Sequence, residues 1–404
     1  MGLRLGYLVP EFPSQTHIFF WREIRALRRL GVEVFTLSTR KPPLSNCRHA
    51  FAPAARAETH YLFPPSIAAV ATWAATEYRG LAKSLAYVRG LENAGFAGRM
   101  RQYGLLPSAV DLLHWARQNH VDHIHAHSCA DAAHLLAMAH RMGGPAYSLT
   151  LHGDLEVYGT DHHSKMRDAA FVCAVGKHLH GQIVDRVKLP ADRILLSFMG
   201  LDLSELTSLG RDRSYTPGKL HLVTVARLNR AKGHVHALAA IRMALQAGLN
   251  LHYTIAGDGP FLDGIRSQIK TLKLDEHITL TGILSESEVC RLLSRADTFL
   301  LPSVGLGEAW PVSVMEAMAA GLPVVASVIG ATPEMIAPNE DGFLVRQGDE
   351  ADLSEKITLL ALDVETRRRI GQAARKTAER RFDITLTATA LRDAILAREK
   401  PVEI

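Results

Sequence analysis

The stretch over residues 303–327, SVGLGEAWPVSVMEAMAAGLPVVAS, holds the residues whose types and spacing best suit a ligand site. Glu308 lies in a glycine-bearing loop just before a predicted helix over residues 312–320, and Glu316 lies inside that helix. Free N–H groups at a helix start favour an anion, usually a phosphate. A carboxylate one turn further in can accept hydrogen bonds from a pair of sugar hydroxyls. The pattern therefore predicts a site for a phosphate and a polyol, with a solvated helix carrying two surface glutamates as the alternative.

Turn-forming residues define the elements that hold these two glutamates. The apolar run Thr298–Leu301 is predicted as a buried strand that ends at Pro302. Pro311 suits the first helical position because its missing N–H would be unpaired there anyway. Gly321 suits the position just past the helix, and Pro323 prevents the helix from restarting. A strand, a loop, a helix and a second strand therefore follow one another here.

Two cations form a second candidate group. Arg227 and Lys232 follow the predicted strand Leu220–Ala226. Cations at a strand end near a helix N-terminus are suited to neutralising a diphosphate. The alternative is a basic loop exposed to solvent.

Histidines gather at two neighbouring predicted strands. His123, His125 and His127 alternate along one strand, so their side chains share one face. That pattern suits zinc, but no acidic or cysteine ligand is nearby, and the alternative is a set of hydrogen-bonded histidines at a strand end. His152 follows the predicted strand Ala146–Leu151, and ligands bind at the carboxyl ends of parallel strands. His152 is therefore a candidate site residue, with a loop histidine bonded to the backbone as the alternative, and no metal is predicted.

Strands and helices alternate along the whole chain. The strand Leu3–Val9, a helix from Thr16 through Leu30 and the strand Val32–Leu37 make a βαβ unit. Its first loop lacks G-x-G-x-x-G, which argues against a dinucleotide site. The polar segment Ser208–Lys219 is predicted as a linker. Because 404 residues are too many for one compact core, two doubly wound α/β domains are expected.

Composition indicates an ordinary globular chain, with 47% hydrophobic and 22% charged residues. Its four cysteines are scattered without a C-x-x-C pair, so we expect a reduced cytoplasmic protein with neither disulfides nor a zinc ribbon. The first ten residues already read as a strand followed by a proline, so no signal peptide is expected. No apolar run approaches the roughly 20 residues that span a bilayer.

Positive charge is concentrated near the N-terminus. Residues 1–101 hold 14 Lys and Arg against 6 Asp and Glu, whereas the whole chain carries only +5. This excess predicts an anionic partner such as a membrane surface, a lipid phosphate or nucleic acid, with a solvated basic face as the alternative. The stretch Pro64–Arg101 is predicted to be helical, with an apolar and a basic face, and suits either a bilayer interface or a helix pair packed on the first domain. Residues 40–60 are predicted as a loop.

Several motifs resemble those of retaining glycosyltransferases of family 4, which have the GT-B fold. The E-x7-E pattern followed by AMAAGLPVVAS is similar to that family's donor-site signature, although Ala309 stands where the family usually has glycine. VARLNRAKG resembles V-G-R-L-x-x-x-K-G, whose Arg and Lys pair with the donor diphosphate. The runs FPSQTHIF, HIHAH and MGLD resemble bacterial exopolysaccharide transferases of the colanic-acid type, with departures at Gln15 and His17.

The resemblance implies two Rossmann-like domains that face a cleft. An acceptor-binding domain is expected over residues 1–205, a donor-binding domain over 206–380, and a helix that crosses back to the first domain over 381–404. Such an enzyme moves a sugar from a UDP- or GDP-sugar to a glycan or polyprenyl-diphosphate-linked acceptor with retained configuration. No metal or other cofactor and no nucleic acid partner is expected, and the protein is placed in the cytoplasm, at the inner face of the plasma membrane. The competing functions are a GT-B epimerase or phosphorylase, a dehydrogenase, and a scaffold that binds nucleotide sugars without turnover.

The resemblance also assigns roles to single residues. His152 is expected near the transferring sugar, and Arg227 and Lys232 are expected to neutralise the diphosphate. Glu308 and its loop are expected to hold sugar hydroxyls and phosphate. No second carboxylate pairs obviously with Glu308, so the two-carboxylate arrangement of a glycoside hydrolase is not predicted. The remaining donor-binding residues, with Glu316 on the ribose diol, are Gly257, Asp258, Gly282, Gly307, Ala309, Trp310, Pro311, Val312 and Glu316.

Overall fold

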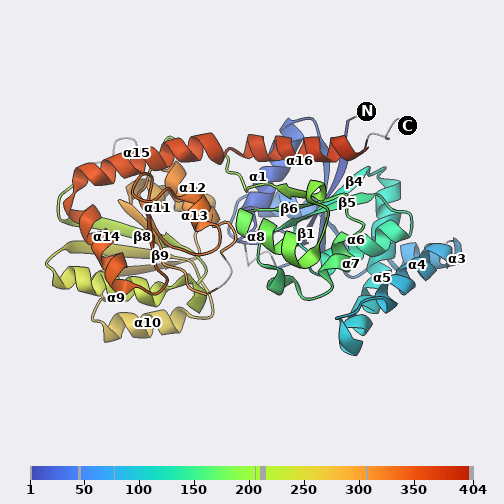
Figure 1. The fold of residues 1–404 in the computed structure, drawn as a ribbon, viewed down its shortest axis with the longest axis horizontal. Helices are drawn as coiled ribbons and strands as arrows, with labels where there is room; N and C mark the ends of the chain where they lie inside the picture. Colours follow the sequence, from blue (N-terminus) through green and yellow to red (C-terminus); the bar gives the residue numbers. More distant parts are fainter. Residues whose placement is uncertain are drawn as a thin grey trace. The chain divides into compact units, whose positions relative to one another are not determined.

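The protein forms two compact units (Figure 1). The computed structural model describes residues 2–43, 47–76, 78–204, 206–209, 215–305 and 308–399. One unit consists of residues 1–200 together with 385–404, and the other consists of residues 201–384. The expected linker at 208–219 lies partly outside the described residues.

The first unit is built on a sheet of seven parallel strands in the order β3-β2-β1-β4-β5-β6-β7. The order reverses direction at β1, so β1 and β4 lie side by side at the centre of the sheet. Ligands bind at such a switch point, beyond the carboxyl ends of the strands. The strands are β1 Arg4–Glu11, β2 Glu33–Arg40, β3 His60–Tyr61, β4 His123–Ala126, β5 Ala146–Leu151, β6 Phe171–Ala174 and β7 Ile194–Leu196.

Helix α1 of the first unit buries an apolar stripe. In α1, Phe20, Ile24 and Leu27 recur at helical spacing and are all buried. In α16, Arg398 donates to the Asp192 carbonyl at 2.7 Å and lies over the Phe171 ring. The helices are α1 Ile18–Arg29, α2 Ala52–Glu58, α3 Ile67–Thr76, α4 Tyr78–Arg89, α5 Gly95–Gln118, α6 Asp131–Arg141, α7 His162–Met166, α8 Lys177–Gln182 and α16 Ile384–Glu399.

Two local predictions for the first unit are wrong. The expected loop over residues 40–60 contains α2, because the run APAARAE is rich in alanine and places a proline in the first helical turn. Helix α1 begins at Ile18 and has His17, not Thr16, as its N-terminal cap, because a turn from Ser14 to His17 comes first. The helical prediction for residues 64–101 is confirmed by α3, α4 and the start of α5.

The helices α4 and α5 pack on the first unit. Ser84 donates to the Met138 carbonyl at 3.0 Å, and the Tyr87 hydroxyl lies 2.6 Å from His134 Nδ1. Other apolar side chains of this region stay in solvent: Ile67 is 86% exposed and Phe96 is 83% exposed. Among the residues that the structure describes, none of the helices is long and apolar enough to cross a lipid bilayer.

The second unit is built on six parallel strands in the order β10-β9-β8-β11-β12-β13. Its core gathers Leu222, Ile241, Tyr253 and Ile357 from the central strands and from two flanking helices. The strands are β8 Lys219–Val225, β9 Asn250–Ala256, β10 Ile278–Gly282, β11 Thr298–Leu301, β12 Val324–Ser327 and β13 Phe343–Val345. The helices are α9 His234–Gln246, α10 Leu262–Thr271, α11 Glu286–Arg295, α12 Val312–Ala319, α13 Thr332–Met335, α14 Glu350–Leu362 and α15 Val364–Arg381.

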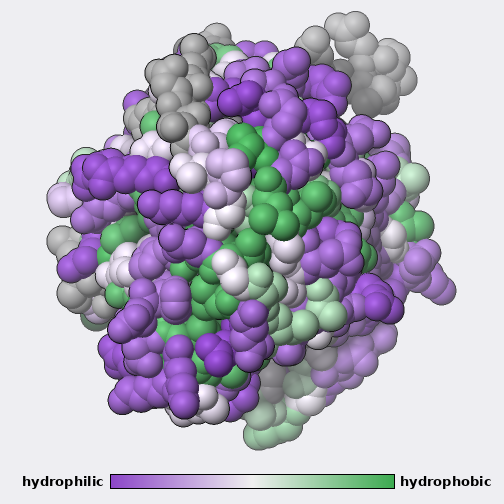
Figure 2. Space-filling model, turned by 90° about the vertical axis from the view of Figure 1, so that its left-hand side faces the viewer, coloured by the Kyte–Doolittle hydropathy of each residue, from purple (hydrophilic) through white to green (hydrophobic). Residues whose placement is uncertain are grey.

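Hydrophilic side chains predominate on the face of the molecule shown in Figure 2, and hydrophobic side chains form smaller patches between them. This face lies at the end of the second unit near α9 and α14. Met243 of α9 and Leu362 of α14 are among the exposed hydrophobic residues of the second unit. Such a mixture is normal for a protein surface in water.

Candidate functional site

Two backbone contacts in the second unit leave no room for a side chain. At Gly233, with φ of 66°, a Cβ would lie 1.7 Å from the Pro302 carbonyl oxygen. At Gly330, with φ of 51°, a Cβ would lie 1.7 Å from the Glu308 carbonyl oxygen. Only glycine fits both the positive φ and the close approach. The loops after β8, β11 and β12 therefore meet at the carboxyl edge of the sheet, where parallel sheets bind ligands.

This meeting of loops joins Lys232 to Glu308, 76 positions apart in the chain. Lys232 Nζ forms an ion pair and hydrogen bond with Glu308 Oε1, and Ser303 Oγ donates to the same oxygen at 2.7 Å. Glu308 is 6% exposed and Ser303 is fully buried. A buried carboxylate needs such donors to offset its lost hydration. Both donors use Oε1, so Oε2 has no donor among the described residues and can accept a hydrogen bond from a ligand.

Helix α12 follows this cluster directly. Its bounds agree with the predicted helix, Pro311 caps it, and Gly321 takes a φ of 73° just beyond its end. Glu316 lies in its second turn and is 9% exposed. Trp310 is also buried: its indole N–H donates to Met315 Sδ at 3.1 Å. The predicted donor contact at Trp310 is therefore limited to its backbone, whereas Ala309 and Val312 are half-buried.

The other predicted residues of the second unit gather at the ends of β8, β9 and β10. Gly257 has a φ of 146°, and a Cβ there would lie 1.9 Å from the Ala226 carbonyl oxygen. Its N–H donates to the Gly282 carbonyl at 2.9 Å, and the Asp258 carbonyl accepts from Leu228 at 3.0 Å. Arg227 is exposed at the same strand end. The structure thus brings these positions together, whereas Gly307 lies outside the described residues.

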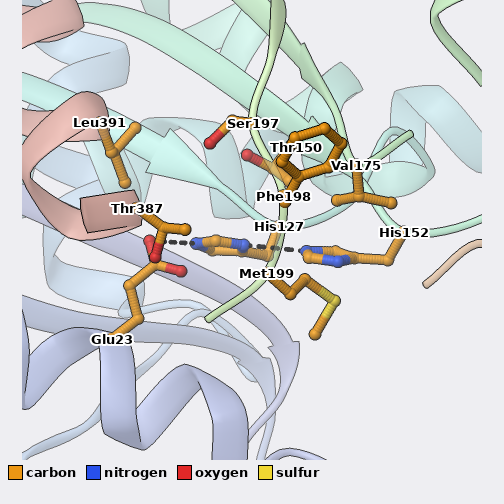
Figure 3. Close-up of a pocket in the computed structure, with 10 residues that line it drawn as sticks. All are labelled: Glu23, His127, Thr150, His152, Val175, Ser197, Phe198, Met199, Thr387 and Leu391. Carbon is orange, nitrogen blue, oxygen red and sulfur yellow. Dashed lines mark hydrogen bonds and ion pairs between the residues drawn. The ribbon is translucent and has the colours of Figure 1, made fainter. Parts of the chain in front are cut away.

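In the first unit, His152 belongs to a line of three polar side chains (Figure 3). His152 Nε2 lies 3.0 Å from His127 Nδ1, and His127 Nε2 lies 3.8 Å from Glu23 Oε1. The backbone N–H of His152 donates to the Tyr158 hydroxyl at 2.7 Å, which holds the residue at the end of β5. The three side chains line a small pocket together with Thr150, Val175, Ser197, Phe198, Met199, Thr387 and Leu391.

Residues 213–377 match the family model of glycosyl transferases, group 1. The chain is similar over almost its full length to solved structures of Anabaena HepE in complex with UDP and glucose, with a TM-score of 0.75, 15% identity, and 98% of this chain and 100% of that one covered. Sucrose-phosphate synthase from Thermosynechococcus elongatus gives a TM-score of 0.70 with 16% identity over 98% and 99% of the two chains. The protein has the GT-B fold. The matched domain supports the assignment of this chain as a glycosyltransferase.

Two bacterial proteins resemble this GT-B chain in sequence. The putative colanic acid biosynthesis glycosyltransferase WcaL of Escherichia coli K12 is 27% identical over 94% of this chain and 96% of its own length. The amylovoran biosynthesis glycosyltransferase AmsK of Erwinia amylovora is 37% identical over 41% of each chain. The predicted two-domain α/β fold is confirmed, whereas the roles of the single site residues stay predictions.

The titratable groups around His152 in this glycosyltransferase are held neutral. Burial, together with the nearby His17, lowers the pKa of His152 to about 3. Burial lowers the pKa of His127 well below its usual value. Burial raises the pKa of Glu23 to about 8, an effect that Tyr7 partly opposes. At neutral pH the favoured state therefore has neutral imidazoles and a protonated Glu23.

The remaining histidines of the HIHAH run are hydrogen-bonded. His123 Nε2 and His125 Nδ1 lie 2.8 Å and 2.7 Å from Ser148 Oγ, and His125 Nε2 lies 2.8 Å from Thr150 Oγ1. These contacts fit the alternative to zinc binding, a set of hydrogen-bonded histidines at a strand end. Within the described parts of the chain, no group of three or more His, Cys, Asp or Glu side chains is arranged to hold a metal ion.

Sequence reasoning did not single out Glu23 or Ser303. Glu23 is an acidic residue between the buried apolar residues Phe20 and Ile24 of α1, and a charge at that position is the signal that would have revealed it. Ser303 follows the strand-ending proline, five positions before Glu308, but its bond to Glu308 depends on the loop's path. Neither contact follows from local periodicity.

Proposed function

We propose that this glycosyltransferase moves a sugar from a nucleoside diphosphate sugar, UDP- or GDP-linked, to a glycan or polyprenyl-diphosphate-linked acceptor during exopolysaccharide synthesis. The observation that carries this proposal is the Lys232–Glu308–Ser303 cluster beside the N-terminus of α12. The cluster offers a cation, free helical N–H groups and a carboxylate oxygen, which together suit a diphosphate and a sugar hydroxyl. The naming of the colanic acid and amylovoran relatives supports the pathway, and the UDP complex of the Anabaena protein supports the donor class.

In the proposed reaction the anomeric configuration is retained. The acceptor oxygen bonds to the anomeric carbon on the face from which the diphosphate leaves. The bond between that carbon and the diphosphate breaks, its electron pair goes to the departing phosphate oxygen, and that oxygen takes the acceptor proton. Arg227 and Lys232 stabilise the charge that develops on the diphosphate, and Glu308 Oε2 accepts a hydrogen bond from a sugar hydroxyl. Glu316 binds the ribose diol, and His152 keeps its predicted place near the transferring sugar.

Positive charge from Arg227 and Lys232 makes a divalent metal unnecessary in this proposal. A transfer assay in EDTA should therefore give the same rate as an assay with Mg²⁺ or Mn²⁺. Loss of activity in EDTA that either metal restores would contradict this part of the proposal.

The donor site is tested by a nucleotide panel. UDP, GDP, ADP and NAD are compared at equal concentration by thermal shift, since a ligand of the folded state stabilises it in proportion to ln(1 + [L]/Kd). UDP or GDP should raise the melting temperature, NAD should not, and Lys232→Ala should abolish the effect. Lys270→Ala is the matched control, because Lys270 is an exposed lysine on α10 of the same unit.

The outcomes of the panel separate the competing functions. Stabilisation by NAD alone would contradict the transferase and favour a dehydrogenase. Stabilisation by UDP or GDP without acceptor-dependent release of the nucleoside diphosphate would favour the scaffold, and Ala309→Gly would then be the first variant to assay.

The basic, apolar helices of the first unit are proposed to meet an anionic membrane surface. Ile67 and Phe96 are more than four-fifths exposed, Met100 is half exposed, and Lys83 and Arg89 are exposed on α4. Apolar side chains that enter the headgroup region and cations that attract anionic lipid are the two features of an interfacial helix. A lipid-linked acceptor would be presented at the same surface.

A further inference from the structure

Glu23, His127 and His152 form a continuous polar line within the first unit (Figure 3). The line starts on α1, passes the end of β4 and finishes at the end of β5. Only 1% of the His127 side chain and 16% of the Glu23 side chain are exposed. Tyr7 and Phe20 pack against the His127 ring at centroid distances of 4.5 Å and 4.7 Å, and these contacts restrict the rotation of the ring. Its two nitrogens therefore keep their directions, one toward Glu23 and one toward His152.

A hydrogen bond between two neutral imidazoles contains one proton, so the two rings share a linked choice of tautomer. If His127 Nδ1 donates to His152 Nε2, then His127 Nε2 is a bare lone pair and His152 carries its proton on Nδ1. If His152 Nε2 donates instead, then His127 Nε2–H faces Glu23 and His152 Nδ1 is bare. The first arrangement matches a protonated Glu23, and the second matches its carboxylate. The 3.8 Å separation is longer than a hydrogen bond but close enough for the Glu23 charge to act.

The last nitrogen of this line, His152 Nδ1, is available to bind a ligand. His152 Nδ1 is buried and has no hydrogen-bond partner in the described protein. Buried polar atoms are almost always paired, so an unpaired one at a pocket needs an explanation, and a catalytic role is one of them. The pocket that His152 lines supplies that setting.

We propose that Glu23, acting through His127, decides which ring nitrogen of His152 carries the proton, and so whether His152 offers substrate a donor or an acceptor at Nδ1. The donor form goes with protonated Glu23 and suits a sugar or acceptor oxygen. Conversion to the acceptor form releases one proton in all: the Glu23 proton passes to His127 Nε2, the His127 Nδ1 proton passes to His152 Nε2, and the His152 Nδ1 proton is released. Glu23 and His127 are positioning residues, and their effect on turnover rests on the proposed function.

Two other titratable groups near Glu23, Tyr7 and Cys173, do not change charge in the same range. Tyr7 faces Glu23 from β1, and burial raises its pKa well above the usual value. Cys173 faces it from β6, and burial raises the pKa of that thiol to about 12. His17 acts on both His127 and His152 from the start of α1. A His17→Gln variant therefore separates the titration of His17 from that of Glu23.

The test on activity is the pH profile of kcat for sugar transfer by the full chain. In the wild type, kcat should fall about tenfold per pH unit above pH of about 8, as Glu23 loses its proton. Glu23→Gln cannot ionise, so its kcat should be about two- to tenfold lower at pH 7 and should not fall between pH 7 and 9. Glu92→Gln, an exposed glutamate of the same unit, and His17→Gln should keep the alkaline fall. An alkaline fall that persists in Glu23→Gln would overturn the proposal.

The test on structure needs neither substrate nor activity. In protein labelled with ¹⁵N-histidine, the ring signals of His152 are identified by their loss in His152→Gln, and they report directly which nitrogen is protonated. The signals should change from protonated Nδ1 at pH 7 to protonated Nε2 at pH 9.5, and Glu23→Gln should hold the first form throughout. A tautomer that is unchanged across this range would overturn the proposal. A tautomer change in a protein that transfers no sugar would support the linkage and would contradict the proposed function instead.

Discussion

The two units treat a buried glutamate in opposite ways. In the second unit, Glu308 is paired with Lys232 and receives a further hydrogen bond from Ser303. In the first unit, Glu23 faces the neutral His127, and burial raises its pKa to about 8. A carboxylate stays charged where a cation and donors replace its hydration, and it takes up a proton where they do not. The Lys232–Glu308–Ser303 cluster is therefore suited to a charged diphosphate sugar. The line of Glu23, His127 and His152 is suited to directed hydrogen bonds with neutral groups.

The largest expected effect is on kcat/KM, and it comes from removing Lys232, the cation of the Lys232–Glu308–Ser303 cluster. Lys232→Ala should lower kcat/KM for sugar transfer about 100- to 1,000-fold, because it removes charge stabilisation from the leaving diphosphate and leaves Glu308 without its ion-pair partner. Acceptor-dependent release of nucleoside diphosphate measures this, with Lys270→Ala as the control. A loss of kcat/KM of less than about threefold would show that the Lys232–Glu308 pair is not needed for a charged donor, and the contrast with Glu23 would then fail.

A smaller effect is expected at Glu316, which tests how far the donor site extends along α12. Glu316→Ala should weaken nucleotide affinity by about 1.5–3 kcal/mol, because hydrogen bonds between a charged group and hydroxyls are lost. Titration calorimetry with UDP and GDP gives the affinity directly. Glu286→Ala is a suitable control, because Glu286 is a glutamate in the first turn of another helix of the same unit. Equal affinity in wild type and Glu316→Ala would rule out the ribose contact.

The smallest expected effect is on binding to anionic liposomes, which depends on basic side chains at the surface. Residues 1–101 carry an excess of basic residues, 14 Lys and Arg against 6 Asp and Glu. Each cation near an anionic surface contributes about 1 kcal/mol, and salt reduces this. The protein should float with anionic liposomes at low salt more than with neutral ones.

A matched pair of variants assigns this binding to the first unit. Phe96→Ser should reduce flotation, whereas Leu362→Ser, at an exposed leucine of the second unit, should not. Equal flotation with anionic and neutral liposomes would remove the membrane from the proposal.

Local patterns predicted much of the fold and one half of the candidate site. The observed bounds of β5 and β11 are those expected from apolar runs and their flanking turn residues. The helix that carries Glu316 was predicted within one residue, because Pro311 and Gly321 mark its ends. Turn chemistry and hydrophobic period act over a few residues, so they can be read from the chain alone.

The failures have a shared cause. The loop expected over residues 40–60 contains α2, whose alanine-rich segment forms a helix too short to show a clear period. Helix α1 begins at Ile18 rather than with Thr16 as its cap, because a turn from Ser14 to His17 precedes it. A strand end or a loop places a residue near a site, yet only packing decides which side chains point into it.

The chain by itself determined where many strands and helices occur, and that Glu308 precedes α12 and Glu316 lies within it, since these follow from short-range periodicity and turn residues. Tertiary structure alone decided that Lys232 and Ser303 share one oxygen of Glu308, and that Glu23 reaches His152 through His127. These contacts join residues brought together by parallel strands far apart in the chain. The charge of a carboxylate depends on such neighbours and on its burial, neither of which is written in the residues next to it.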